Sequence, residues 1–346
     1  MNTTIREYLK KNKLICDGAF GTYYGQLYDT DTLPEYDNIN HPDKIRKIHE
    51  EYIEAGTMLI RTNTFASNSV SLNFPYNNEI NLSEHTYNEA LDYVKQNIEK
   101  ACDIAFSAAS DRAFVAGSIG PIPYENISLK SQYMEEYISI CNVFIAKKVD
   151  MIIFETFSHI DDILPAIVYI HNNSNIFIGV QFAVNQFGYS SLGLSFKKLF
   201  DMALSNPYID SVGLNCGVGP SHMKKLFDKL NIVLPKNKYI SAFPNAGYPK
   251  IVSNRAMYTS DNEDYFAGIL KEISKSGISI LGGCCGSTPE YTKKMCRTID
   301  IYDNSIYKCD AEGETTNIHV TDLSFYKNKL NSKSGEKLIA VELAPP

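Results

Sequence analysis

Short apolar runs alternate along the chain with longer segments in which apolar residues recur every three or four positions. Runs such as Met151–Glu155 and Ile176–Phe182 are apolar at successive positions, which is typical of strands buried on both faces of a parallel sheet. The alternation therefore predicts repeated βα units. The expected strands are Lys13–Asp17, Thr57–Asn63, Phe114–Ser118, Met151–Glu155, Ile176–Phe182, Ser211–Asn215, Tyr239–Phe243 and Ile278–Gly282.

The segments between these runs have helical periodicity, most clearly over residues 83–109. Apolar positions there are spaced alternately four and three apart from Tyr87 to Ala108, so they form one buried stripe. Ser287-Thr288-Pro289-Glu290 predicts a helix start with a hydroxyl cap, a proline in the first turn and a capping-box glutamate. Eight βα units in about 300 residues predict a (β/α)8 TIM barrel, an α/β fold, over residues 1–302. The alternative is a doubly wound open sheet, because periodicity does not show closure.

Composition and charge narrow the possible partners. The 33 Lys and Arg residues against 40 Asp and Glu residues give a net charge of −7, which argues against a nucleic-acid partner, since phosphate binding needs clustered cations. No apolar run approaches the roughly 18 residues of a membrane span. The charged N-terminal segment does not resemble a signal peptide, so we expect a cytoplasmic protein. Eight cysteines in a reducing compartment indicate thiol or metal chemistry more than disulfides.

The barrel pattern ends near residue 302. Residues 303–336 are polar and lack sustained periodicity, so we interpret them as a linker or peripheral segment. The chain then ends on a strand-like sequence, KLIAVELAPP, at residues 337–346.

Three cysteines follow predicted strands. Cys216 ends the sixth strand and the Cys284-Cys285 pair ends the eighth, and the carboxyl ends of barrel strands meet at one mouth. Three thiolates with one open position are typical of a catalytic zinc site. Burial as apolar core residues is the competing interpretation. Against it, the pair is flanked by glycines that permit a sharp turn, namely Gly282, Gly283 and Gly286.

Two carboxylates also end predicted strands. Asp17 precedes Gly18 and Gly21, where backbone N–H groups could form a concave anion site. Glu155 emerges from the apolar run MIIF, and its charge is costly there without a partner. A structural ion pair is the alternative explanation. Together these groups suit the ammonium and carboxylate of an amino acid, and an adjacent thiolate-ligated metal suits an amino acid that carries a thiol.

Seven short motifs occur in one order along the chain: DGAFGT, RTNTF, SIGP, FET, GLNCG, PNAGYP and GGCCGSTPEY. In this order they resemble the homocysteine S-methyltransferase family, which includes betaine-homocysteine methyltransferase and the first module of cobalamin-dependent methionine synthase. The resemblance covers about Leu14 to Ile299 and nearly every strand end. It implies a (β/α)8 barrel with Zn²⁺ at the mouth and L-homocysteine as the methyl acceptor, converted to L-methionine.

The resemblance also implies roles for individual residues. Zinc would hold the homocysteine sulfur in its open position and remove the proton of a thiol whose free pKa is about 8.5. The implied metal ligands and catalytic residues are Cys216, Cys284 and Cys285. Asp17 and Glu155 would bind the amino group of homocysteine, and the backbone of Gly18, Ala19 and Phe20 would bind its carboxylate or pack nearby. Asn215 and Asn245 would support the metal-binding loops.

The methyl donor stays open at this stage. It could be a methylcorrinoid, a methylfolate-derived group, S-methylmethionine or S-adenosylmethionine, whereas a betaine is less favoured because no aromatic cage can be located. KLIAVELAPP resembles the opening strand of methylenetetrahydrofolate reductase, as in bacterial proteins that fuse the two enzymes, so a covalently fused reductase is a possible partner. A function of another class would be a non-catalytic zinc or thiol redox module that uses Cys284 and Cys285.

Overall fold

Eight parallel strands form one sheet in the computed structural model, and each lies where the sequence predicts it. The chain is described over residues 3–72, 84–123, 130–230, 234–248, 250–252, 255–257 and 262–302, all within one compact unit, Met1–Tyr307. The predicted linker 303–336 and the reductase-like segment 337–346 lie outside the described residues. The strands are β1 (Leu14–Ile15), β2 (Leu59–Arg61), β3 (Phe114–Ile119), β4 (Met151–Phe157), β5 (Phe177–Phe182), β6 (Ser211–Asn215), β7 (Tyr239–Phe243) and β10 (Ile280–Leu281).

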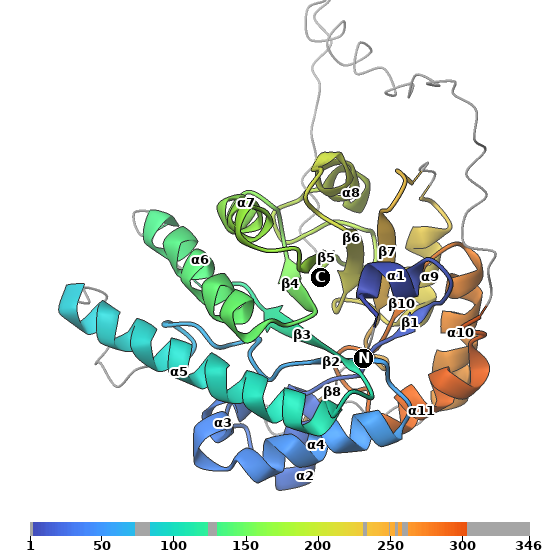
Figure 1. Cartoon of the computed structure of the whole chain (residues 1–346). Coiled ribbons are helices and arrows are strands. Elements are labelled where there is room, and N and C mark those ends of the chain that lie inside the picture. The colour runs from blue at the N-terminus through green and yellow to red at the C-terminus, as the bar shows by residue number, and fades with distance from the viewer. Residues whose placement is uncertain are drawn as a thin grey trace, which may run out of the picture. The chain divides into compact units, whose positions relative to one another are not determined.

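The sheet closes into a barrel. Neighbouring strands follow the order β1-β10-β7-β6-β5-β4-β3-β2, and a parallel bridge between Cys16 and Leu59 joins the two ends of this order. Figure 1 shows the helices arranged around the strands. The (β/α)8 TIM barrel is therefore confirmed over the open-sheet alternative.

Helices connect and cover the strands. The predicted periodic segment forms α5, whose Val94, Ile98, Ala101 and Ala105 are buried, as the stripe requires. Within the described ranges, no helix combines the length and the apolar character that crossing a membrane needs. The helices are α1 (Ile5–Leu9), α2 (Gly21–Tyr28), η1 (Pro34–Tyr36), α3 (Asp37–Asn40), α4 (Pro42–Glu54), α5 (Glu84–Ala109), α6 (Lys130–Lys147), α7 (Leu164–Asn173), α8 (Phe196–Ser205), α9 (Pro220–Phe227), α10 (Glu263–Lys275) and α11 (Pro289–Thr298).

Alternation along the strands divides the core into two layers. Ile152 and Phe154 of β4 pack outward against the helices, whereas Met151 and Ile153 belong to the cluster inside the barrel. With a side-chain period of two, the next inward position of β4 is Glu155. The same count places polar side chains at the inner ends of other strands, which is why the carboxyl end of the barrel, here called the mouth, is polar inside.

Helix α1 lies at the opposite, amino-terminal end of the barrel, the end that faces the viewer in Figure 1. Ile5 and Leu9 of this helix join the inner cluster with Phe114 and Phe177. Thr4 begins the helix with a capping box that includes Glu7, and such a box satisfies backbone N–H groups that a helix start leaves unpaired. The amino-terminal end of the inner core is thereby covered.

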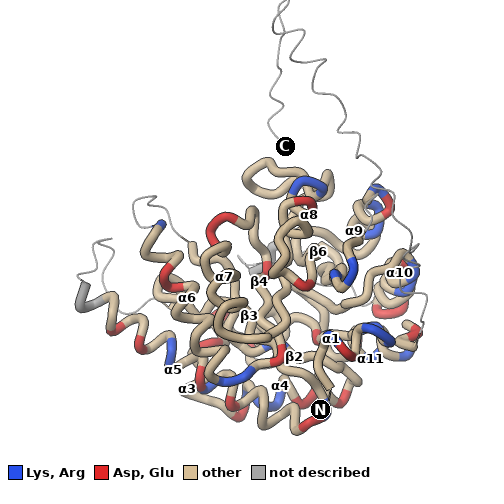
Figure 2. Tube along the Cα trace, turned by 45° about the horizontal axis from the view of Figure 1, so that its top comes forward, with Lys and Arg blue, Asp and Glu red and all other residues tan. Residues whose placement is uncertain are grey.

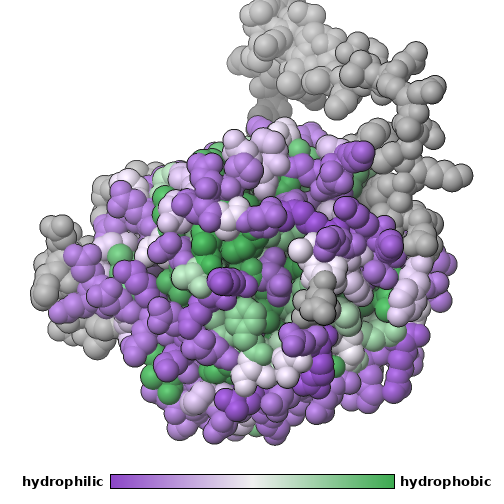
Figure 3. Space-filling view, viewed as in Figure 1, coloured by the Kyte–Doolittle hydropathy of each residue, from purple (hydrophilic) through white to green (hydrophobic). Residues whose placement is uncertain are grey.

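The outer surface is polar and mixed in charge. Figure 2 shows Lys and Arg interspersed with Asp and Glu along the outer helices. On the face seen in Figure 3, hydrophilic residues dominate the rim and hydrophobic ones show mainly toward the centre, between the helices. This distribution fits helices whose apolar stripes turn toward the strands.

One element was not predicted. Strands β8 (Lys250–Val252) and β9 (Arg255–Met257) form an antiparallel pair between β7 and α10. They belong to the connection that leaves β7 at the mouth.

Candidate active site

Three cysteines from two loops come together at the mouth. Cys216 follows β6, and Cys284 and Cys285 follow β10; their sulfur atoms all lie within 4.8 Å of one another. The Sγ atoms of Cys216 and Cys285 are 3.8 Å apart. Hydrogen bonds from the neighbouring thiols lower the pKa of Cys216 to about 3, and the same bonds raise the pKa of Cys284 well above its usual value. The cluster therefore favours a thiolate at Cys216.

The backbone of the two loops explains how these thiols meet. Cys216 has a φ of 58° and is followed by Gly217 at 71°, so the chain reverses sharply after β6. In the second loop only Gly286 of the three flanking glycines has a positive φ, 82°. Gly283 is needed for a different reason, because a Cβ there would collide with the side chain of Ser287. The predicted glycine freedom thus applies at Gly286, while Gly283 permits close packing.

Ser287 fixes the cysteine-bearing loop to the first loop of the barrel. Its Oγ donates to the carbonyl of Cys284 at 2.7 Å and accepts the N–H of Ala19 at 3.1 Å. The predicted hydroxyl cap and capping box are wrong, since α11 begins at Pro289 after Thr288, which makes no side-chain cap hydrogen bond. The Ser287 hydroxyl bonds within the loops, so it does not cap the helix.

Asn215 and Asn245, the two asparagines expected to support the metal loops, lie beside the cysteines. The Asn215 side chain donates to Thr156 Oγ1 and accepts the Thr156 N–H, both at 2.8 Å, and its Nδ2 lies 4.0 Å from Cys284 Sγ. Asn245 hydrogen-bonds to Cys216, which helps to lower the pKa of that thiol. Thr156, directly after Glu155, has a φ of 69°, a costly conformation for a β-branched residue. Asn215 therefore holds a strained residue that adjoins the carboxylate.

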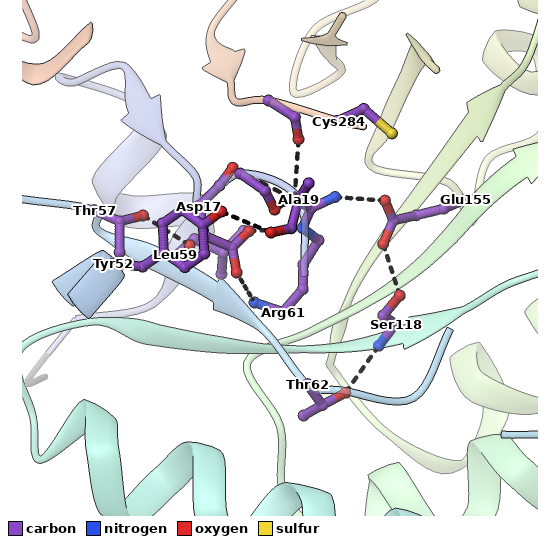
Figure 4. Close-up of polar contacts among 12 residues, drawn as sticks. Asp17, Ala19, Tyr52, Thr57, Leu59, Arg61, Thr62, Ser118, Glu155 and Cys284 are labelled. Atoms are coloured by element: carbon purple, nitrogen blue, oxygen red, sulfur yellow. Dashed lines mark hydrogen bonds and ion pairs between the residues drawn. The ribbon is translucent and has the colours of Figure 1, made fainter. Parts of the chain in front are cut away.

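The two predicted carboxylates are joined by Arg61, the last residue of β2. Arg61 Nε donates to Asp17 Oδ1 and Nη1 donates to Glu155 Oε2, each at 2.7 Å, and the Arg61 backbone N–H donates to Asp17 Oδ2 at 2.8 Å. Glu155 Oε1 accepts from the Ser118 hydroxyl at 2.7 Å. Figure 4 shows the guanidinium between Asp17 and Glu155, with Ser118 on the far side of Glu155.

The network is buried and its charges balance in part. Asp17 is 1% exposed, Glu155 3% and Arg61 9%. Burial raises the pKa of Asp17, and the nearby Arg61 charge opposes this increase. Burial would lower the pKa of Arg61, but the charges of Asp17 and Glu155 outweigh it and raise that pKa well above its usual value. The guanidinium is thus charged, and removing it would leave two buried carboxylates without their cation.

The loop after β1 supplies the remaining predicted residues. Glycine fits at position 18 because a Cβ there would lie only 2.7 Å from Ser287 Oγ and 2.8 Å from Tyr52 Oη. The Ala19 N–H is bonded to Ser287, and the Ala19 carbonyl accepts from the Tyr52 hydroxyl at 2.7 Å. Phe20 precedes α2 and makes no side-chain cap, and the first N–H groups of a helix have no partner within the helix itself. Of the two roles predicted for Ala19, its contacts match packing.

A cavity of about 450 Å³ connects these groups. Arg61 and Glu155 line it. Asp17 is not among the described residues that line it, because Arg61 lies between its carboxylate and the cavity. Also on the wall are Gly18, Ala19, Phe20, Thr156, Asn215, Cys216, Cys284 and Cys285. The three thiols and the buried charged residues Arg61 and Glu155 therefore line the same cavity.

Sequence reasoning missed three participants: Arg61, Thr156 and Ser118. Each lies at or beside a strand end that the patterning identified, and RTNTF, FET and SIGP contain them. Their roles depend on contacts between strands far apart in sequence. The available signal was the inward register of Arg61 and Ser118, two residues beyond Leu59 and Ala116 of the inner cluster.

The fold and this site define a (β/α)8-barrel enzyme whose polar groups converge at the carboxyl ends of its strands. The profile of the homocysteine S-methyltransferase family matches residues 14–299, and the chain belongs to this family. The family is described by its reaction, methyl transfer to the sulfur of homocysteine.

Two curated relatives, both methionine synthases, are much longer than this chain. Methionine synthase of Mycobacterium leprae is 25% identical over 329 residues, which cover 86% of this chain and 25% of that protein. Methionine synthase of Mycobacterium tuberculosis is 24% identical with the same coverage. The chain thus spans about a quarter of the length of these relatives.

Solved structures share the fold. The homocysteine methyltransferase MmuM from Escherichia coli in its apo form has a TM-score of 0.60 at 18% identity, and covers 84% of this chain and 97% of its own. Its metallated form gives 0.63 at 16% identity, covering 83% and 97%. At these identities the likeness concerns the barrel.

Proposed function

We propose that this protein is a zinc-dependent homocysteine S-methyltransferase that forms L-methionine. The observation that carries the proposal is the convergence of three thiols and the buried carboxylate Glu155 on one cavity. Thiols alone would suit many metal sites, but an acceptor with both an amino group and a thiol needs the two features together.

The donor set fits zinc. Zinc binds thiolate sulfur at about 2.3 Å in a tetrahedron, which places two ligand sulfurs about 3.8 Å apart. The Cys216 and Cys285 Sγ atoms are 3.8 Å apart, and all three sulfurs lie within 4.8 Å of one another. The metallated form of MmuM also supports a metal here. When bound, zinc would lower the pKa of the acceptor thiol and so supply a nucleophilic thiolate at neutral pH.

The protein's own residues orient the acceptor. Glu155, which lines the cavity, receives the ammonium group, and Asp17 contributes by holding Arg61 in place. The N–H groups at the start of α2, around Phe20, favour the substrate carboxylate. Asn215 and Asn245 keep the cysteine-bearing loops in register. Gly18 and Ala19 allow close packing of the first loop on the last.

Methyl transfer then follows from this placement. The acceptor sulfur attacks the methyl carbon in line with the bond to the donor atom. A sulfur–carbon bond forms as the carbon–donor bond breaks, the donor keeps the electron pair, and the thiol proton goes to solvent.

The donor is not fixed by the acceptor site. A methylcorrinoid, a methylfolate-derived group, S-methylmethionine and S-adenosylmethionine remain candidates, and the cavity of about 450 Å³ has room beyond homocysteine itself. A covalently fused reductase stays a prediction, since residues 337–346 lie outside the described part of the chain. A cytoplasmic location likewise stays a prediction.

The non-catalytic zinc or thiol redox module is not favoured. Such a module has no need for a cavity that joins the thiols to Glu155. The experiment that separates the two is metal analysis of protein purified under reducing conditions, followed by an assay of homocysteine-dependent methionine formation with each donor. We expect about one zinc per chain and methionine from at least one donor. Zinc without methionine from any donor would support the module.

A further inference from the structure

One loop at the mouth presents large apolar side chains to solvent. Residues 183–195 connect β5 to α8, and the loop contains no charged residue; Figure 2 shows the segment that leads into α8 without Lys, Arg, Asp or Glu. Its Phe187, Tyr189 and Leu192, here called the rim residues, are 72%, 49% and 60% exposed. Single exposed apolar residues are common, but large ones grouped on one element mark an interaction site.

Two tight turns give this loop a fixed shape. The N–H groups of Gly188 and Gly193 each donate to the carbonyl three residues earlier, at 2.9 Å, and both glycines have a positive φ, 86° and 75°. Phe187 and Leu192 directly precede these glycines, so each lies at the tip of a turn. Asn185 Oδ1 also accepts the Phe187 N–H at 3.0 Å. A loop that is already ordered loses little conformational freedom when a partner binds.

The loop is joined to the segments that carry the site. Gly217, next to Cys216, packs so closely on the loop that a Cβ there would lie 2.3 Å from the Val184 carbonyl oxygen. On the other side, Ser191 Oγ lies 2.6 Å from the Oγ of Ser158, the residue after β4. A molecule held by the rim residues therefore lies beside the thiols to which the methyl group must be brought.

We infer that the rim residues bind a carrier protein, which delivers the methyl group on a cofactor that it holds. The inference deepens the proposed function and rests on it. Among the donors left open, it selects a protein-held methylcorrinoid or methylfolate-derived group over free S-methylmethionine or S-adenosylmethionine. A free donor of that size needs only the cavity of about 450 Å³, whereas a carrier must also contact the surface around the mouth.

The size of the surface fits a partner that comes and goes. A large side chain buries about 150–250 Å² at most, so three partly exposed ones bury on the order of a few hundred Å². Stable complexes bury about 1,200–2,000 Å² in total, and smaller interfaces belong to transient encounters. A permanent dimer of this chain would need a larger apolar face. A spent carrier, in contrast, has to leave before the next methyl group arrives.

Two further observations agree with a carrier. The matching face of the partner has to be apolar, because the loop offers no charged residue to an ionic partner. The matched region makes up only 25% of each of the two methionine synthases, so in these relatives the barrel also works beside further protein.

The first test is photocrosslinking of the full chain in its native host. The photoreactive amino acid p-benzoylphenylalanine takes the place of Phe187, of Leu192 or, as a matched control, of Val168, an apolar residue of α7 that is 40% exposed. We expect positions 187 and 192, and not 168, to crosslink to a protein that mass spectrometry identifies and that holds a corrinoid or a folate. A crosslink only to a second copy of this chain, only to a protein without such a cofactor, equally from position 168, or to nothing would overturn the inference.

The second test separates delivery from the acceptor site. Phe187→Ser combined with Leu192→Ser should leave zinc content and homocysteine affinity, measured by calorimetry, within about twofold of wild type, because neither residue lines the cavity. Methionine formation in the host cells should fall by about tenfold or more, as for loss of apolar anchors from an interface. Val168→Ser should change none of these quantities. An unchanged rate of methionine formation in the double variant would contradict docking at the rim residues.

The outcomes also distinguish the inference from the proposed function. If the wild-type protein forms methionine and the double variant matches it in cells, the inference alone fails. If the carrier crosslinks at positions 187 and 192 but the wild-type protein forms methionine from no donor, the proposed function fails and the docking surface stands.

Discussion

The side-chain amide of Asn215 brackets Thr156, donating to its hydroxyl and accepting its backbone N–H, both at 2.8 Å. Thr156 has a left-handed backbone, with φ at 69°, and it directly follows the carboxylate Glu155. The last residue of β6 thus supports the left-handed conformation near the end of β4. Asn215 also lies near Cys284, so one amide relates the acidic end of the cavity to the thiols.

Asn215→Ala should destabilise the protein and weaken its site. The substitution removes two buried hydrogen bonds, and we expect a loss of about 1–3 kcal/mol in the free energy of unfolding. Zinc affinity should fall as well, because side chains that orient metal ligands typically change affinity by about tenfold or more. Denaturant unfolding and competition with a zinc chelator measure the two effects. If neither the free energy of unfolding nor the zinc affinity changes, the proposed supporting role of the Asn215–Thr156 hydrogen bonds is wrong.

Replacing any one cysteine of the cluster should remove most of the metal. Cys216→Ala, Cys284→Ala and Cys285→Ala each leave an incomplete set of thiolates, and homocysteine-dependent methionine formation should be lost with the zinc. Cys141→Ala is the matched control, since Cys141 is buried in the helix-facing core. This variant should keep the full zinc content of the protein, although it should lose some stability. Full zinc content in all three cluster variants would refute the metal assignment.

Glu155→Gln and Asp17→Asn should weaken homocysteine binding while zinc remains. Glu155 lines the cavity, so its loss removes a direct partner of the ammonium group, and we expect KM to rise by about tenfold to a hundredfold. Asp17→Asn should have the smaller effect, because Asp17 contacts Arg61 and not the cavity. Steady-state kinetics with metal analysis test both variants. If KM stays at the wild-type value in each, the carboxylates do not orient the acceptor.

His49 should make the protein less stable in mild acid. Burial lowers its pKa from 6.5 to about 3, so below pH 6.5 the unfolded chain takes up a proton that the folded protein does not. This contribution is absent above pH 6.5, and stability falls by about 1.4 kcal/mol per pH unit between pH 6.5 and 3. Denaturant unfolding of wild-type protein and His49→Leu from pH 7.5 to 5 measures the difference. A constant difference across that range would show that His49 is protonated equally in both states.

Truncation after Lys333 should leave the barrel intact. Every described helix and strand lies between Ile5 and Thr298, and the bridge from Cys16 to Leu59 closes the sheet within that range. We therefore expect zinc content and Tm within error of the full chain. A large fall in Tm would show that the last residues belong to the barrel core.

The sequence predicted the strands because runs such as Met151–Glu155 are apolar at successive positions, and it predicted the cysteine cluster because Cys216 and the Cys284-Cys285 pair each end a predicted strand. It did not predict the role of Arg61, since the pairing of this cation with Asp17 and Glu155 depends on strands far apart in sequence meeting at the mouth. The capping box predicted from Ser287-Thr288-Pro289-Glu290 did not form, because the Ser287 hydroxyl bonds to the Cys284 carbonyl and the Ala19 N–H, and only tertiary packing brings Ala19 to it. Local sequence patterns thus identified individual residues of the site, whereas the contacts between those residues follow from closure of the barrel.

The bonds from Ser287 to Ala19 and Cys284 have a consequence for how the protein matures during synthesis. Ala19 leaves the ribosome early, whereas Ser287 emerges only after β10 has been made. The cysteine-bearing loop therefore gains its anchor late, after all eight barrel strands have been made. A nascent chain that stops short of Ser287 would hold Cys216 without its two partners. We therefore expect zinc to bind only after the barrel is complete, and not to a growing chain that lacks Cys284 and Cys285.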